Sequence, residues 1–293
     1  MLYLVATILL NTLIFTLFKL FSRFKVDILQ ALVVNYLTCV VTAAVILKGF
    51  PVGSESVNQP WFPWSLLMGA MFITLFCLMA WRTHEDGMTT TTVANKLSMV
   101  IPVLFSIWLY DETVTAGKIA GILLAVPAVY FTTRVKENTK PQSILFPIIL
   151  FVGCGLLDTL VKFVEQSFLQ DPSEHSIYLI HAFLTASVLG LLGIIVLFIL
   201  RKARLHWRNI IAGILLGIPN YFSIHYLIRL LHSDYLQSSA AIPVNNIGIV
   251  LLSALVAIFF FKEKASGMRI LGLVLSIAAI ILIALSDLYG GNA

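Results

Sequence analysis

Apolar runs close to the length of one bilayer crossing recur along this chain from end to end. A helix needs about 20 predominantly apolar residues to cross the hydrocarbon core. Helices and closed barrels are the structures that satisfy their backbone hydrogen bonds there. The composition agrees, because 59% of the residues are hydrophobic and 11% are charged, against about 25% charged in soluble domains. The sequence therefore predicts an all-α integral membrane protein without a soluble domain.

We expect ten transmembrane helices joined by mostly short connections. Their predicted bounds are Leu2–Phe18, Ile28–Leu47, Trp64–Trp81, Met88–Leu109, Ala116–Thr133, Ile144–Val164, Ile177–Leu200, Ile210–Leu227, Ser238–Phe261 and Met268–Leu285. The first run has no basic segment before it and no cleavage-type sequence after it, so we expect a retained helix. The longest connection, 49–63, is rich in proline and predicts an external loop.

Two segments about half the chain apart resemble each other without a gap. Residues 110–121 fall on 261–272 at an offset of 151, so that Gly121 aligns with Gly272. Shorter echoes pair Tyr36–Thr38 with Phe183–Thr185, and Asn95 with Asn245. Five helices per half is an odd number, so the second half crosses the membrane in the opposite sense. The sequence predicts two inverted five-helix repeats, 1–137 and 138–293, joined by a polar hinge at 134–142 within one compact membrane domain.

These repeated segments resemble the drug/metabolite transporter superfamily, specifically EamA-type transporters. In that family each copy ends with an apolar helix, a short acidic turn and a glycine-containing helix. Leu109-Tyr110-Asp111-Glu112 before Gly117 and Gly121 fits this pattern, as does Phe261-Lys262-Glu263 before Gly267 and Gly272. Pro102 fits the proline of the family's fourth helix, whereas the second copy departs from it with Pro243-Val244-Asn245-Asn246. The resemblance implies ten helices around a central cavity and alternating access for small metabolites.

Basic residues mark the orientation of the chain. Odd-numbered connections hold 14 of the 19 lysines and arginines, so the positive-inside rule predicts that these connections are cytoplasmic and that both termini lie outside. The family resemblance implies the opposite, with both termini inside. The dispersed charge forms no nucleic-acid-binding stripe. We expect a multi-pass protein of the bacterial cytoplasmic (inner) membrane, whose partners are lipid and a small-molecule substrate, as a monomer or homodimer.

Four polar residues near the expected junction of the halves are candidates for substrate binding. Lys96 lies about 12 Å into its predicted helix, where a charge needs a partner, a wet cavity or an escape route to the interface. A lysine in a cavity favours carboxylate or other anionic solutes, including amino acids, whereas snorkelling or an ion pair is the structural alternative. Asn95, Asn245 and Asn246 either contact substrate or hold helices together. Asn11, in the first span, joins this group.

Three further residues are candidates for substrate contact or proton coupling. Asp158 either exchanges a proton or forms an ion pair with Lys162, one turn away. His225 either shuttles a proton or contacts substrate, and its alternative is a hydrogen bond to a neighbouring helix. Tyr221 lies one turn before it and is a substrate-contact candidate. Coupling to protons and facilitated diffusion both remain open.

Enzyme and cofactor signatures do not occur in this sequence. There is no Gly-x-Gly-x-x-Gly, Walker A, His-Glu-x-x-His or Gly-x-Ser-x-Gly pattern, so we expect no catalytic residues, no metal and no cofactor. Cys39, Cys77 and Cys154 are expected to be packing residues, and residues 84–87 a solvated turn. The leading hypothesis is a secondary transporter or exporter of small organic metabolites. A membrane-embedded enzyme acting on a lipid or lipid-linked substrate, and a structural or receptor-like subunit, are the alternatives.

Overall fold

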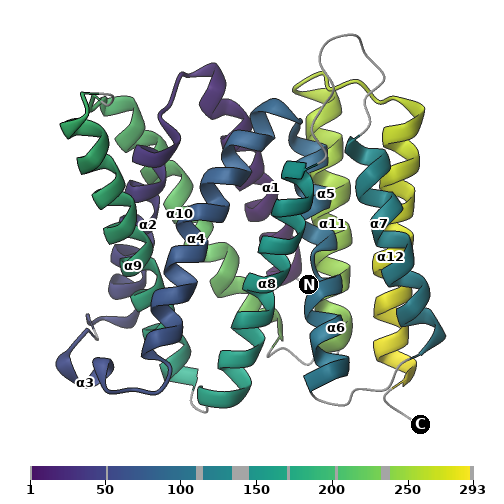
Figure 1. The fold of residues 1–293 in the computed structure, drawn as a ribbon, viewed down its shortest axis with the longest axis horizontal. Helices are drawn as coiled ribbons and strands as arrows, with labels where there is room; N and C mark the ends of the chain where they lie inside the picture. Colours follow the sequence, from purple (N-terminus) through teal and green to yellow (C-terminus); the bar gives the residue numbers. More distant parts are fainter. Residues whose placement is uncertain are drawn as a thin grey trace. The chain divides into compact units, whose positions relative to one another are not determined.

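The computed structural model describes residues 2–50, 52–109, 115–133, 145–169, 172–201, 204–231 and 238–290. Within these ranges the regular structure is helical throughout, without a strand (Figure 1). The predicted hinge at 134–142 and the acidic turn at 110–112 lie outside the described ranges.

Twelve helices occur in the described part of the chain. They are α1 (Leu2–Arg23), α2 (Ile28–Leu47), α3 (Ser54–Val57), α4 (Phe62–Glu85), α5 (Met88–Leu97), α6 (Val100–Leu109), α7 (Ala116–Thr133), α8 (Leu145–Phe168), α9 (Pro172–Ile199), α10 (Trp207–Leu231), α11 (Ser238–Phe259) and α12 (Gly267–Gly290). The second and fifth predicted spans coincide with α2 and α7. The fourth, Met88–Leu109, is divided between α5 and α6, and the predicted external loop contains the short helix α3.

Six of these helices are long and apolar enough to cross a membrane: α1, α2, α4, and the greater part of α9, α10 and α12. Their outward faces are apolar rather than polar. Val41 is 61% exposed, Leu192 53% and Val274 56%. Contiguous exposed apolar surface of this kind is not stable in water and is typical of a face covered by lipid. The chain is thus an all-helical, multi-pass membrane protein.

The fold divides into two compact units. Unit 1 comprises Met1–Lys19, Arg82–Gly155 and Phe222–Ala293, and unit 2 comprises Leu20–Trp81 and Leu156–Tyr221. Each unit therefore contains chain from both predicted repeats. The two units are defined by contacts in space, whereas the two repeats are defined by similarity in sequence. The units therefore do not test the predicted repeats.

Unit 2 is organised by the packing of α2 against α9. The Asp27 side chain accepts a hydrogen bond from Gln30 N–H at 3.0 Å and so caps the start of α2. Within the unit, Tyr36 stacks on Phe72 and Phe183 at ring-centroid distances of 6.2 and 5.9 Å. These rings fill the space between helices with large apolar surfaces.

Unit 1 is organised by α7 against α12, with α11 beside α12 and α5 against both α11 and α7 (Figure 1). Small side chains permit these close approaches. Ala125, Ala128 and Ala279 are fully buried among Ile280 and Ile283 in the core that joins α7, α12 and α5. This packing fixes α5, which carries two of the predicted site residues, at the centre of the unit.

Candidate functional site

The fourth predicted span is interrupted in the middle, between α5 and α6. Pro102 has no N–H to donate to the Ser98 carbonyl, and the N–H of Ile101 bonds that carbonyl instead at 2.9 Å. The Ser98 hydroxyl donates to the Asn95 carbonyl one turn earlier. In a membrane protein such irregular backbone is tolerated where protein or a water-filled cavity satisfies it. At this interruption the Ser98 carbonyl is satisfied by the protein backbone, through the Ile101 N–H.

Two asparagine amides reach the vicinity of this interruption. Asn95 Nδ2 donates to Cys154 Sγ of α8 at 3.2 Å. Asn246 Nδ2, from α11, contacts Met99 Sδ at 3.4 Å. Asn95 and Asn246 thus bring α5, α8 and α11 together, and Cys154 is a hydrogen-bond acceptor as well as the packing residue that we expected.

The neighbouring Asn245 has a side-chain oxygen without a hydrogen-bond donor among the described residues. The atom is Oδ1, and the residue is 3% exposed. A buried amide oxygen without a donor costs about 1 to 3 kcal/mol. Lys96 lies beside Asn95 on α5 and is half-buried. This part of unit 1 therefore holds a cationic group and an available acceptor.

The other predicted site residues are spread over both units. Asn11 is half-buried on α1, and its Nδ2 donates to Thr7 O of the same helix at 2.9 Å. His225 is half-buried on α10, with its ring 5.7 Å from that of Tyr226. Tyr221 is buried and Asp158 exposed, and both belong to unit 2. The side chain of Lys162 lies outside what the structure describes, so its predicted ion pair with Asp158 stays a prediction.

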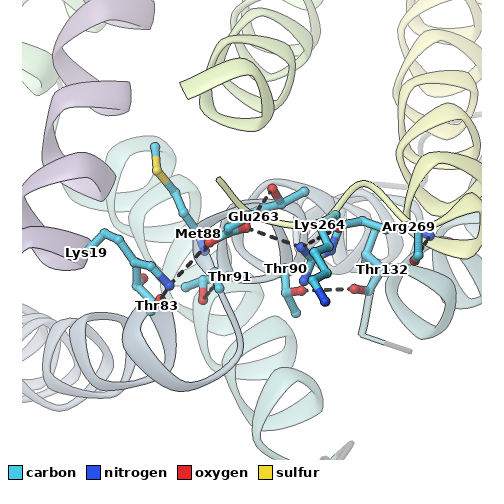
Figure 2. Close-up of polar contacts among 12 residues, drawn as sticks. Lys19, Thr83, Met88, Thr90, Thr91, Thr132, Glu263, Lys264 and Arg269 are labelled. Atoms are coloured by element: carbon cyan, nitrogen blue, oxygen red, sulfur yellow. Dashed lines mark hydrogen bonds and ion pairs between the residues drawn. The ribbon is translucent and has the colours of Figure 1, made fainter. Parts of the chain in front are cut away.

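A second polar cluster was not predicted from the sequence, and Figure 2 shows its contacts. It is centred on Glu263, in the connection between α11 and α12. The Glu263 carboxylate accepts from Met88 N–H at 2.7 Å and from the Thr89 hydroxyl at 3.2 Å. Because Met88 and Thr89 begin α5, Glu263 satisfies N–H groups at the start of a helix 175 residues away in sequence.

Two cations lie against the same carboxylate. Lys19 Nζ of α1 is 3.3 Å from Glu263 Oε1, and Arg269 Nη1 of α12 is 3.5 Å from Oε2. Lys19 also donates to the carbonyl of Thr83 at 3.2 Å, near the end of α4. One carboxylate and one ammonium group therefore join the ends of α1, α4, α5, α11 and α12 within unit 1.

The turn between α4 and α5 is only partly the solvated turn that we expected. Arg82 and Asp86 are buried and form a two-point salt bridge, with Nε 2.7 Å from Oδ2. The guanidinium also lies 4.5 Å from the ring centre of Phe146 of α8. Burial raises the pKa of the Asp86 carboxyl above its usual range, and Arg82 partly offsets that rise. His84 and Glu85 are exposed, as expected.

Among the residues that the structure describes, no three His, Cys, Asp or Glu side chains gather where a metal ion could bind. The site is built instead from amides, one lysine and a backbone interruption.

Six helices long and apolar enough to cross a membrane define the class: a multi-pass, all-helical membrane protein. No family model matches the chain. An uncharacterized protein of Haemophilus influenzae (strain ATCC 51907 / DSM 11121 / KW20 / Rd) is 27% identical over 290 residues, which cover 94% of this chain and 95% of that protein. A solved structure, described as the crystal structure of a protein, has a TM-score of 0.60 at 15% identity and covers 95% of this chain and 96% of that one. This likeness concerns the fold alone.

Proposed function

We propose that this protein is a secondary transporter of small organic metabolites that works by alternating access. The observation that carries the proposal is the interrupted span, where α5 gives way to α6 beside Asn95 and Asn246. Discontinuous helices near the bilayer midplane are the usual site of substrate binding in secondary transporters, because the interrupted backbone exposes polar groups there.

Reciprocal glycine contacts support the inverted repeat on which alternating access depends. A Cβ on Gly121 of α7 would lie 2.9 Å from Ala279 O and 2.6 Å from Ile283 Cγ1 of α12. A Cβ on Gly272 of α12 would lie 3.0 Å from Ala128 O and 2.6 Å from Thr132 Cγ2 of α7. Gly121, Ala128 and Thr132 are each 151 positions before Gly272, Ala279 and Ile283.

A contact that repeats itself with the partners exchanged is the mark of a two-fold relationship. The two helices also run antiparallel. Gly121, early in α7, meets Ala279 and Ile283 late in α12, whereas Thr132, late in α7, meets Gly272 early in α12. Antiparallel equivalents are what an inverted repeat requires. The offset of 151 is the one given by the repeated segments, so the contact pattern and the sequence support the same symmetry.

Unit 2 contains a second reciprocal pair. A Cβ on Gly69 of α4 would lie 2.5 Å from both Ala182 O and Thr185 Cβ of α9. A Cβ on Gly217 of α10 would lie 2.6 Å from Asn35 O and 2.5 Å from Thr38 Cβ of α2. The equivalents are 147 or 148 positions apart, and Thr38 and Thr185 are the pair that the sequence echo aligns. We infer ten spans, with α5 and α6 forming one of them, in two inverted repeats of five.

The proposed substrate site in unit 1 contains Lys96, Asn95, Asn245 and Asn246, with Asn11 and His225 as further candidates of the same unit. Tyr221, in unit 2, is a separate candidate for substrate contact. A lysine favours a carboxylate or another anionic group. The Asn245 oxygen, which accepts no hydrogen bond from the described residues, favours a ligand that donates one. Solutes resembling amino acids carry both groups. Asp158 and His225 are the candidates for proton coupling, and uncoupled facilitated diffusion is the alternative.

An enzyme acting on a lipid substrate needs reactive groups near a membrane interface. At the helix ends of unit 1, the buried carboxylate of Glu263 is engaged with Lys19 and Arg269, and that of Asp86 with Arg82. These engagements favour a structural use of both carboxylates and support the transporter over the enzyme.

The direct test uses the purified protein in liposomes. Radiolabelled amino acids and organic acids, chosen by a screen for thermal stabilisation, should enter protein-containing vesicles faster than empty ones, and Lys96→Ala should slow that entry. Absence of flux for every solute that stabilises the protein would contradict the transporter. Flux at the normal rate in Lys96→Ala would exclude the role of Lys96 alone.

A further inference from the structure

The ten-residue helix α5 has a joint at each end: a non-helical glycine at its start and, at its end, a short turn in which Ser98 keeps helical dihedral angles (φ −57°, ψ −18°). At its start, Gly87 has φ 96° and ψ 157°, a conformation that is essentially restricted to glycine. At its end, Ser98 and Met99 separate it from α6. A rigid segment between two joints can change its direction without melting. Asn95 and Lys96, two residues of the proposed substrate site, lie in its last turn.

Contacts at the first joint are polar and depend on charge. Glu263 binds the first N–H group of α5, Lys19 and Arg269 (Figure 2). The side chains of Glu263 and Arg269 are 8% and 5% exposed. Hydrogen bonds and ion pairs to a desolvated carboxylate are strong. When the helix ends separate, water can replace all of these partners together.

The side chains behind this joint are also unusually polar for a buried helix. Thr89, Thr90, Thr91 and Thr92 are each 1% exposed. Thr90 donates to Thr132 O of α7 at 3.0 Å, and Thr91 to Gly87 O within its own turn at 3.1 Å. Among the described residues the Thr92 hydroxyl has no partner. A turn of threonines buries less apolar surface than a turn of leucines, so less hydrophobic free energy opposes its movement.

We propose that Glu263 is a releasable latch and that α5 is the gating segment that it holds. In the conformation described here the latch is closed, and the start of α5 is tied to α1 and to the connection between α11 and α12. Release of Glu263 lets α5 pivot between Gly87 and Ser98, which moves Asn95 and Lys96 at its other end. The inference rests on the proposed function, because it couples one end of unit 1 to the substrate site.

The latch is tested by the chemical accessibility of Thr92, one turn behind it. Thr92→Cys is a nearly isosteric reporter at a position whose hydroxyl makes no hydrogen bond in the described part of the chain. The full-length protein in permeabilised membranes is treated with a water-soluble maleimide, so that both faces of the membrane are reached. The parent without the reporter gives the background from the native cysteines.

Glu263→Gln in the T92C reporter should raise the labelling rate on the order of tenfold, since it removes charge-assisted bonds that hold the latch closed. Lys19→Met removes one partner of the latch and should raise the rate by a smaller factor. Glu85→Gln removes a carboxylate from the same turn at an exposed position and should leave the rate unchanged.

Labelling that rises in both latch variants and not in E85Q supports the latch. Equal rates in T92C alone and in T92C combined with E263Q or K19M overturn it, and K19M decides alone if E263Q does not accumulate in the membrane. The readout needs no substrate, so a failure of the latch is separate from a failure of transport. Absence of flux in liposomes contradicts the proposed function, whereas unchanged labelling contradicts the gate.

Discussion

Gly87 and the Glu263 carboxylate approach each other so closely that a side chain at position 87 would force the carboxylate to shift. A Cβ on Gly87 would lie 2.9 Å from Glu263 Oε1 and 3.0 Å from Oε2. The backbone of Gly87, with φ 96°, is strained for any other residue. The turn between α4 and α5 and the cap on α5 thus depend on the same missing side chain.

Gly87→Ala should therefore destabilise the protein by about 1 to 3 kcal/mol from backbone strain alone, with a further cost as Glu263 is displaced. The melting temperature in detergent, followed by tryptophan fluorescence, measures the effect. Gly53→Ala is the matched control, because a Cβ there meets nothing within 4 Å and φ is −140°. Equal melting temperatures for G87A and G53A would contradict the dependence on Gly87.

The buried Asp86 carboxyl should make stability depend on pH. Its pKa is raised in the folded protein, so folding favours the protonated form, and the associated stability is present below the unfolded pKa of about 3.9. That stability is lost as pH rises through the higher folded pKa. The melting temperature of the wild type minus that of Asp86→Asn should decrease as pH rises from 4 to 7. A difference that grows over this range would show that the pairing with Arg82 outweighs burial.

The sequence was sufficient to predict the class of fold, because each span carries its own signal. Ile28–Leu47 coincides with α2 to the residue, and Ala116 is the first residue of α7, as predicted, since long apolar runs are bounded by charged or polar residues. The interruption at Ser98 was not predicted, although Pro102 was noted. A proline removes one donor, but whether its helix bends or breaks depends on which neighbours satisfy the freed carbonyl. That information is not local.

Some residues of the candidate site could be proposed from sequence alone, and others could not. Asn95, Asn245 and Lys96 could be identified because polar groups within apolar runs are costly. Glu263 was treated as a marker of the repeat, since its partner at the start of α5 is 175 residues away. A turn such as 84–87 looks solvated in sequence, and the burial of Asp86 depends on Phe146 and Arg82, which come from α8 and α4. Contacts between distant segments were beyond the reach of composition and spacing.

Reciprocal glycine contacts predict matched effects of substitution in unit 2. Gly69→Ala and Gly217→Ala should each destabilise by about 1 to 3 kcal/mol, because each Cβ would overlap backbone as well as a threonine side chain. Gly193→Ala is the control, since its Cβ would lie 3.4 Å from Leu29 Cδ2, an ordinary contact. Melting temperatures in detergent measure all three. A large effect at one of Gly69 and Gly217 with none at the other would contradict their equivalence.

Asn245 and Asn209 should separate function from stability. Asn209 is 1% exposed, accepts from Asp27 N–H at 3.0 Å and donates to Gln30 Oε1 at 2.8 Å. Asn209→Leu should therefore lower the melting temperature, corresponding to a loss of about 1 to 3 kcal/mol, because it leaves buried partners unsatisfied.

Asn245→Leu removes an oxygen that accepts no hydrogen bond within the described part of the chain, so the melting temperature should stay the same or rise. If that oxygen is reserved for substrate, the same variant should lose about tenfold or more of the flux in liposomes, and thermal stabilisation by the transported solute should weaken. Flux at the wild-type rate in a stable N245L would remove Asn245 from the substrate site. A lowered melting temperature together with lowered flux would instead assign Asn245 to helix packing.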